Sequence, residues 1–269
     1  MTDKELYKSA LDFLLSFDKV KQTDLDKHLV SEYEKPKDLQ IIYRQLCASA
    51  QNKQMSSKVI GNSIGGLDKL KKVLFDFDPH KVADYYKKTE SERLLTDICD
   101  KLKPAGQIRT TKRSLWPIFC QSVIDSAYFL KSFETADKFY EWANFFANDS
   151  KAKPALPLMI SIEITGLGFP LACDFLKEIG FVEYGKPDVH LKDIFEALDI
   201  IDPNEKSATK QDYATLKAID KIADACNVTP FAVDKVFWLI GSGNFYLTGI
   251  NIGKQKQKFI EKIKMKYTT

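Results

Sequence analysis

Two glycines, Gly166 and Gly168, stand between two runs of helical periodicity and form a candidate phosphate site. Glycine allows a positive φ and lets the backbone come close to a partner. The first N–H groups of the following helix have no acceptor within that helix, so they point outward as donors for an anion. The pattern predicts a helix, a hairpin turn at Gly166-Leu167-Gly168 and a helix, with backbone amides rather than side chains holding the phosphate.

A second candidate segment follows the second of these helices. It reads Gly185-Lys186-Pro187-Asp188-Val189-His190, and another helix continues from it through Leu198. An aspartate in this place is by default an N-cap, whose side chain accepts hydrogen bonds from the first turn. The helix dipole and the free N–H groups stabilise a carboxylate there, so we expect Asp188 to stay charged.

Together, the two segments resemble the helix-hairpin-helix (HhH-GPD) superfamily of DNA glycosylases, which includes endonuclease III and the adenine and 3-methyladenine glycosylases. That family pairs a hairpin of the form LPGVGxxTA with a V-D-T-H segment that opens the next helix. The corresponding residues here are 164–172 and Pro187-Asp188-Val189-His190. The resemblance is close over residues 155–200, the hairpin and catalytic segment, and looser over the rest of the chain.

By this resemblance, Asp188 occupies the position of the family's catalytic aspartate. Cleavage of an N-glycosidic bond passes through an oxocarbenium-like sugar, which an ionised carboxylate stabilises while it steers or deprotonates the attacking water. His190 is expected to brace the loop around Asp188 rather than to bind a metal. The resemblance implies an enzyme that flips a damaged or modified base out of double-stranded DNA and hydrolyses its glycosidic bond.

Two departures from the family pattern refine this expectation. Bifunctional members have a lysine nucleophile at the second position after the hairpin, where this sequence has Pro170, preceded by Phe169. The resemblance therefore implies a monofunctional enzyme with an apolar site entrance, unless Lys177 or Lys186, both expected to be solvated, reaches the sugar. The four cysteines of the endonuclease III iron–sulfur loop are missing, so we expect no metal and no cofactor beyond a monovalent cation at the hairpin.

Further DNA contacts are expected on both sides of these segments. Ala48-Ser49-Ala50-Gln51 is similar to a segment of endonuclease III whose glutamine fills the gap left by a flipped base, so Gln51 is either such a plug or an ordinary helix-end glutamine. Residues 101–113 contain five basic side chains and no acid, and residues 254–266 contain six lysines, Lys254 among them, and one acid. Each basic segment either tracks phosphates or forms a solvated surface.

The elements that must position these residues are helical nearly throughout. Apolar residues recur at steps of three and four, as at Leu39, Ile42, Tyr43 and Leu46. Alternating strand patterns are essentially absent. We therefore expect an all-α fold, with two closely packed helical subdomains and the helix-hairpin-helix motif between them, forming one glycosylase-like unit over residues 1–269 whose internal boundary stays open.

Four residues are expected to start helices. Asp78 and Thr229 each precede a proline, which suits the first helical position. Thr89 has capping-box spacing with Glu92, and Thr209 precedes an apolar helical run. The ten aromatic side chains of residues 115–146 are expected to be mostly core, with one or two lining a pocket.

Composition places the chain among folded globular proteins. Its 269 residues are 44% hydrophobic and 29% charged, which excludes a disordered or fibrous protein, and the formal net charge of +3 does not by itself indicate a nucleic-acid binder. Five scattered cysteines fit reduced thiols, and the short amphipathic N-terminal run is typical of neither a signal peptide nor a membrane anchor. We expect an intracellular monomer, in the cytoplasm or nucleoid, or in the nucleus of a eukaryote.

Two other interpretations stay open. A non-catalytic helix-hairpin-helix protein would bind the DNA backbone as a scaffold or sensor, and it would need the glycines but no aspartate at the position of Asp188. An all-α protein-interaction domain would make the glycine pair an accidental turn. The identity of the excised base is not readable, because the shape of a base pocket is set by side chains on distant helices.

Overall fold

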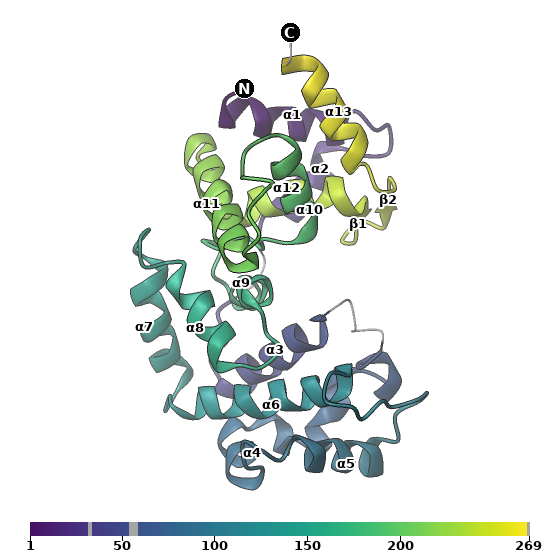
Figure 1. The fold of residues 1–269 in the computed structure, drawn as a ribbon, viewed down its shortest axis with the longest axis vertical. Coiled ribbons are helices and arrows are strands. Elements are labelled where there is room, and N and C mark those ends of the chain that lie inside the picture. Colours follow the sequence, from purple (N-terminus) through teal and green to yellow (C-terminus); the bar gives the residue numbers. More distant parts are fainter. Residues whose placement is uncertain (32–33, 54–58, 268–269) are drawn as a thin grey trace. The chain divides into compact units, whose positions relative to one another are not determined.

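The computed structural model describes residues 1–31, 34–53 and 59–267. The described chain is helical nearly throughout, which confirms the predicted all-α fold (Figure 1). Its sheet structure, as far as the description reaches, is one antiparallel pair of two-residue strands, β1 (Asn244–Phe245) and β2 (Ile250–Asn251). No described helix has the length and apolar character needed to cross a membrane. The chain divides into two compact units: unit 1 is Met1–Tyr33 with Gly180–Thr269, and unit 2 is Glu34–Ile179.

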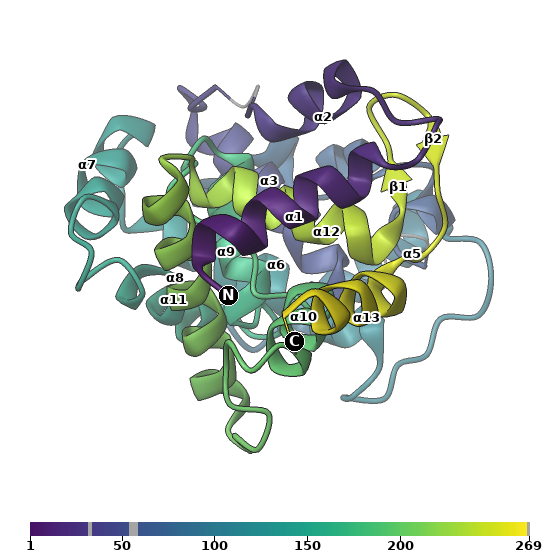
Figure 2. The same ribbon diagram turned by 90° about the horizontal axis from the view of Figure 1, so that it is seen from above.

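Unit 1 is built from both ends of the chain. Its helices are α1 (Asp3–Leu15), α2 (Gln22–Leu29), α10 (Val189–Ala197), α11 (Ala208–Cys226), α12 (Pro230–Ser242) and α13 (Lys256–Tyr267). The apolar helix α12 packs against all five of the others, and it buries Val236, Phe237 and Ile240 among them. Helices α1 and α13 also contact each other, although they come from opposite ends of the sequence (Figures 1 and 2).

Unit 2 contains the middle of the chain. Its helices are α3 (Leu39–Gln51), the 3₁₀ helices η2 (Asn62–Ile64), η3 (Leu67–Lys72) and η4 (Phe75–Phe77), then α4 (Pro79–Tyr85), α5 (Ser91–Leu102), α6 (Leu115–Lys131), α7 (Ala136–Ala147), α8 (Ala155–Glu163) and α9 (Phe169–Glu178). The long helix α6 packs against α3, α4, α5 and α8. The buried hydroxyl of Tyr43 on α3 donates to the carbonyl of Val123 on α6 (3.0 Å), so the central contact also pairs a polar group.

Asp78 and Thr229 start helices, as predicted. Asp78 accepts hydrogen bonds from the N–H groups of His80 and Lys81, both at 3.1 Å, and Thr229 accepts one from the N–H of Ala232 at 3.2 Å. Both helices, α4 and α12, have proline as their first residue, where the missing N–H breaks no helical hydrogen bond.

The predicted starts at Thr89 and Thr209 are wrong. Helix α5 has Glu90 as its N-cap residue, one position after Thr89. Helix α11 has Ser207 as its N-cap, whose hydroxyl accepts from the N–H of Lys210 at 3.4 Å. Serine is as good an N-cap as threonine, so α11 begins at the earlier of the two candidates and Thr209 lies inside it.

Four of the ten aromatic side chains of residues 115–146 are buried, five are half-buried and one is exposed, so the prediction that most of them are core is only partly right. Phe129, Phe133, Phe139 and Trp142 contact one another with ring centroids 5.3–6.5 Å apart. The contacts are mostly edge-to-face, the arrangement that aromatic quadrupoles prefer. Phe145 lies outside this cluster of four rings, and 74% of its surface is exposed.

Candidate functional site

The predicted helix-hairpin-helix is present in unit 2 and consists of α8, a turn and α9. Gly166 has a φ of +82°, a conformation that favours glycine. Leu167 is buried, and its N–H donates to the carbonyl of Ile164 (3.2 Å). Gly168 is the N-cap residue of α9 with an ordinary extended backbone. The two glycines therefore have different structural tasks.

Gly166 lets the hairpin turn pack closely against α6. A β-carbon at this position would lie 2.6 Å from Cγ2 of Ile118 and 2.9 Å from Oγ of Ser122. The backbone of Thr165 is held next to it, because its N–H donates to Oδ2 of Asp125 (3.0 Å) and its carbonyl accepts from the Ser122 hydroxyl. Gly166 is thus required by packing, whatever the hairpin binds.

Gly168 leaves an open surface. It is exposed, and the nearest atom to a β-carbon placed there is Cδ of Pro170, at 3.9 Å. Among the described residues, no acceptor pairs with the N–H groups of Gly168 and Phe169. These two donors at the start of α9 suit an anion. The Phe169 ring is buried and supports the loop, so only Pro170, which is half-buried, contributes to an apolar entrance.

The end of α3 lies beside the hairpin. Gln51 is the last residue of α3 and is half-buried. Two residues later, Nζ of Lys53 is 3.6 Å from the position that a β-carbon of Gly166 would occupy. The chain just after the plug candidate therefore reaches the hairpin within unit 2. Sequence reasoning missed Lys53, whose signal was a basic side chain two positions after Gln51.

Lys177 was expected to be solvated, and that expectation is wrong. It is 4% exposed and forms an ion pair (3.3 Å) with Asp174, which is 9% exposed. Helix α9 buries every residue from Ala172 to Lys177, so the aliphatic stem of the lysine is covered along with its apolar neighbours. The ion pair holds the ammonium group inside unit 2.

Asp188 lies in unit 1, where it is the N-cap of α10. Its Oδ1 accepts from the N–H groups of His190 (2.8 Å) and Leu191 (3.3 Å). Its own N–H donates to the carbonyl of Lys186 (2.8 Å), and the N–H of Lys186 donates to Oδ2 of Asp234 (3.0 Å). Backbone bonds thus fix the carboxylate in one orientation.

The hydrogen bonds of the helix start do not give Asp188 a lowered pKa, and its predicted charged state stays a prediction. Burial raises the pKa of Asp188 above 3.8, and the nearby carboxylate of Asp234 raises it further. His190, Lys186 and the hydrogen bond from Leu191 lower the pKa of Asp188, but by less than burial and Asp234 raise it. The carboxyl group is therefore a better base than an ordinary aspartate.

Asp78 provides an internal comparison. It caps α4 through the same two kinds of N–H group and is also followed two residues later by a histidine. Desolvation raises its pKa, but hydrogen bonds from Lys81 and His80 and the charge of Lys81 outweigh it, so the pKa of Asp78 is lowered. The two caps share a geometry and differ in the direction of their pKa shifts, which makes Asp188 the candidate functional group of the two.

His190 packs against the backbone of α12, as a loop brace would. A β-carbon on Gly241 would lie 2.4–2.5 Å from the Cβ, Cγ and Nδ1 atoms of His190, so only glycine admits the imidazole there. Its Nδ1 is buried without a hydrogen-bond partner in the described part of the chain. No cluster of three or more His, Cys, Asp or Glu side chains that could hold a metal occurs among the described residues.

Asp234 is the residue of this region that sequence reasoning missed. It is 1% exposed and stands in the middle of the apolar helix α12, where a carboxylate is costly unless it has partners. It anchors the loop through the N–H of Lys186 and acts on the pKa of Asp188. An acid inside an apolar helical run was the available signal.

The lysines of the C-terminal basic segment, residues 254–266, differ in exposure and in pairing. Lys254 and Lys258 are exposed in unit 1. Lys256 instead forms an ion pair with Asp193 of α10, so its charge is already engaged. The prediction that this segment contacts DNA therefore rests on Lys254 and its exposed neighbours.

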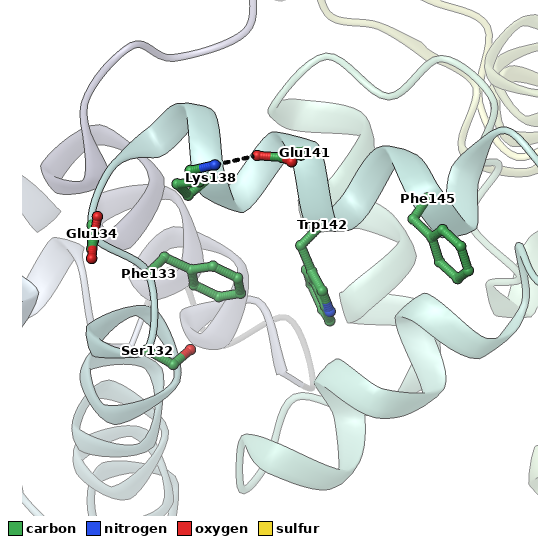
Figure 3. Close-up of a pocket in the computed structure, with 7 residues that line it drawn as sticks. All are labelled: Ser132, Phe133, Glu134, Lys138, Glu141, Trp142 and Phe145. Carbon is green, nitrogen blue, oxygen red and sulfur yellow. Dashed lines mark hydrogen bonds and ion pairs between the residues drawn. The ribbon is translucent and has the colours of Figure 1, made fainter.

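Part of the aromatic cluster lines a hollow of about 610 Å³ in unit 2 (Figure 3). Figure 3 shows the rings of Phe133 and Trp142 next to each other, near the ion pair between Lys138 and Glu141 (2.8 Å). Three aromatic side chains, Phe133, Trp142 and Phe145, line the hollow, where one or two were predicted. None of the predicted site residues is among those that line it.

No protein-family model and no curated protein matches this chain. A solved structure does match it, that of the 8-oxoguanine glycosylase/lyase of Methanocaldococcus jannaschii in complex with a 15mer DNA containing 8-oxoguanine. The match covers 87% of this chain and 96% of that chain, with a TM-score of 0.53 and 15% sequence identity. The chain therefore has the fold of that glycosylase, and the fold alone is what this likeness shows.

Proposed function

We propose that this protein is a monofunctional DNA glycosylase, with Asp188 as the carboxylate that stabilises the oxocarbenium-like sugar and activates water. The observation that carries the proposal is the state of Asp188. Its carboxylate is fixed by two backbone N–H groups, and its pKa is raised, which brings it closer to that of a base useful near neutral pH. The fold shared with a DNA glycosylase/lyase supports the same reaction class.

Two observations support hydrolysis without strand cleavage. A lyase step needs a nucleophilic amine that forms a Schiff base with the sugar. The hairpin has Pro170 at the position where the resembling family has lysine, and Lys177 is buried in an ion pair. Water activated by Asp188 is the nucleophile that this proposal requires.

The hairpin binds the DNA backbone in this proposal. The N–H groups of Gly168 and Phe169 hold a phosphate, and a monovalent cation bound by neighbouring carbonyls can assist them. Gln51 fills the gap left by the flipped base, and Lys254 adds affinity that is independent of sequence. The partner is double-stranded DNA, bound by a monomer.

We expect base release without strand cleavage when purified protein meets duplexes that each contain one modified base. The panel begins with 8-oxoguanine, the base in the DNA of the structural neighbour, and continues with other oxidised, alkylated and deaminated bases. Released base and alkali-labile sites are measured, and borohydride is added to trap any Schiff base. No covalent protein–DNA adduct should form.

A borohydride adduct would show that an amine acts and that the monofunctional assignment is wrong. Lys53→Met and Lys186→Met then identify the amine, because Lys53 lies beside the hairpin and Lys186 beside Asp188. If the protein binds duplex DNA but releases no base from any member of the panel, the non-catalytic binding protein is the better description.

Asp234→Asn should move the acidic limb of the pH dependence of kcat/KM to lower pH. Asp234 raises the pKa of Asp188, so removing its charge lets Asp188 ionise at lower pH, while an amide oxygen can still accept from Lys186. Rates of base release are measured across the acidic range. Asp224→Asn removes an exposed charge from α11 of the same unit and should leave the limb in place. An unmoved limb in Asp234→Asn would contradict the coupling.

A further inference from the structure

A second hollow of unit 2, of about 450 Å³, lies at the start of α6. Two arginines, Arg109 and Arg113, line it together with the polar side chains of Thr111 and Ser114 and the apolar Leu115 and Trp116. Its volume is in the range of small-ligand sites. None of the residues assigned to the hairpin, the plug or the catalytic segment is among its lining residues.

The hollow is electropositive. Arg109 and Arg113 are exposed, and neither has an ion pair or a hydrogen bond among the described residues. The surrounding stretch, residues 101–113, has five basic side chains and no acid to compensate them. A guanidinium group presents a planar fork of donors that matches the oxygens of a phosphate. Two such groups at one concave surface indicate an anionic ligand.

The backbone adds donors to the same place. The third residue of α6 is Pro117, which has no N–H, so the N-cap Ser114 makes no capping bond and its hydroxyl instead contacts that of Thr111 (2.6 Å). In the part of the chain that is described, the N–H groups of Leu115 and Trp116 have no acceptor. An anion held by the arginines would lie at these free donors as well.

Helix α6 joins this hollow to the hairpin. Gly166 is seated on Ile118 and Ser122, three and seven residues beyond Leu115. At a rise of about 1.5 Å per residue, the two places are roughly 5–10 Å apart along the helix axis. One strand of duplex DNA has a phosphate about every 3.4 Å of its axis. The hairpin and the hollow can therefore hold phosphates of one strand that are only a few nucleotides apart.

We infer that the hollow at the start of α6 is a second phosphate subsite, in which Arg109 and Arg113 hold a phosphodiester of the same DNA strand that the hairpin binds. This inference rests on the DNA binding in the proposed function and adds a contact to it. A free nucleotide offers the same phosphate chemistry. The arrangement favours the strand as the occupant, because the Gly166 turn of the hairpin packs on the same helix, α6, that begins at the hollow.

The test measures binding of an undamaged 15-base-pair duplex to the full chain across a range of salt concentrations. The Arg109→Gln/Arg113→Gln variant should bind at least ~10-fold more weakly, and its slope of log affinity against log salt should fall by about one to two units. The matched control is Lys101→Gln/Lys112→Gln, which removes two charges from the same segment but outside the hollow. It should lose much less affinity.

Equal losses in the two double variants would show a diffuse field of charge and overturn the subsite. A separate titration with 2′-deoxyadenosine 5′-monophosphate tests the other source of phosphate. Binding of this nucleotide that depends on Arg109 and Arg113, with duplex affinity unchanged in the variant, would overturn the assignment to the strand. Because undamaged DNA is the probe, a failure to release bases leaves this result untouched.

Discussion

Asp188→Asn should reduce the turnover of base release by a factor of at least ~100, the scale expected when one electrostatic or general-base group is removed. Asparagine is also a good N-cap, so it can accept the hydrogen bonds from His190 and Leu191. It has no charge to stabilise the oxocarbenium-like sugar. Single-turnover rates on a duplex that the wild type processes measure the loss, and binding to the same duplex should be retained or tighter.

Thermal stability distinguishes a variant that has lost only the charge of Asp188 from one that no longer folds. Since the pKa of Asp188 is raised in the folded protein, its charged form disfavours folding at pH values above that folded pKa, and the penalty disappears as the pH falls below the unfolded value near 3.8. Asparagine has no such penalty. The Tm of Asp188→Asn at neutral pH should therefore be no lower than that of the wild type.

Asp78→Asn is the matched control. It makes the same chemical change at an N-cap of similar geometry, in unit 2. The pKa of Asp78 is lowered, so removing its charge should cost stability at neutral pH and leave turnover unchanged. If Asp188→Asn releases the base at close to the wild-type rate, Asp188 is only a cap and the catalytic carboxylate lies elsewhere.

Substitutions of the two hairpin glycines should have different effects, one mainly on stability and the other mainly on DNA binding. Gly166→Ala should destabilise the protein by about 2–5 kcal/mol, from a left-handed backbone and from the overlap with Ile118 and Ser122. For a protein of this size, that corresponds to a Tm lower by roughly 4–9 °C. Gly168→Val has open space and an ordinary backbone, so it should cost about 1 kcal/mol or less.

For DNA affinity, we expect Gly168→Val to have the larger effect of the two variants. A valine at position 168 covers the free N–H groups of Gly168 and Phe169, and the loss of a phosphate contact should weaken duplex binding at least ~10-fold. Thermal melting and duplex affinity are measured for both variants at one salt concentration. A collapse of stability in Gly168→Val, or unchanged affinity, would mean that this glycine serves the turn alone.

The helices and the hairpin were predictable because local chemistry determines them. The hairpin needs a glycine where φ is positive, and Asp188 stands directly before an amphipathic run, so both features are visible in a short stretch of sequence. The same holds for Asp78 and Thr229, where a capping side chain precedes a proline. In each case the deciding interactions span only three or four residues.

The rest depends on contacts between distant parts of the chain. The pKa of Asp188 is raised by burial and by Asp234, which lies 46 positions away on another helix. Lys53 reaches Gly166 only because α3 and α9 pack together. Lys177 is buried because α9 is covered on most sides. No periodicity in the sequence reports such packing.

The division of the chain has a consequence for its synthesis. Unit 2 is contiguous, so all of its residues have been made once Ile179 is added, whereas unit 1 needs α1 and α2 as well as the last 90 residues. At roughly 5–20 residues per second, a ribosome takes about 5–20 s to make that last part. Throughout this interval the apolar face of α1, with Leu6, Phe13 and Leu14, has no α12 to cover it. The nascent chain therefore exposes this apolar face of α1 until α12 has been made.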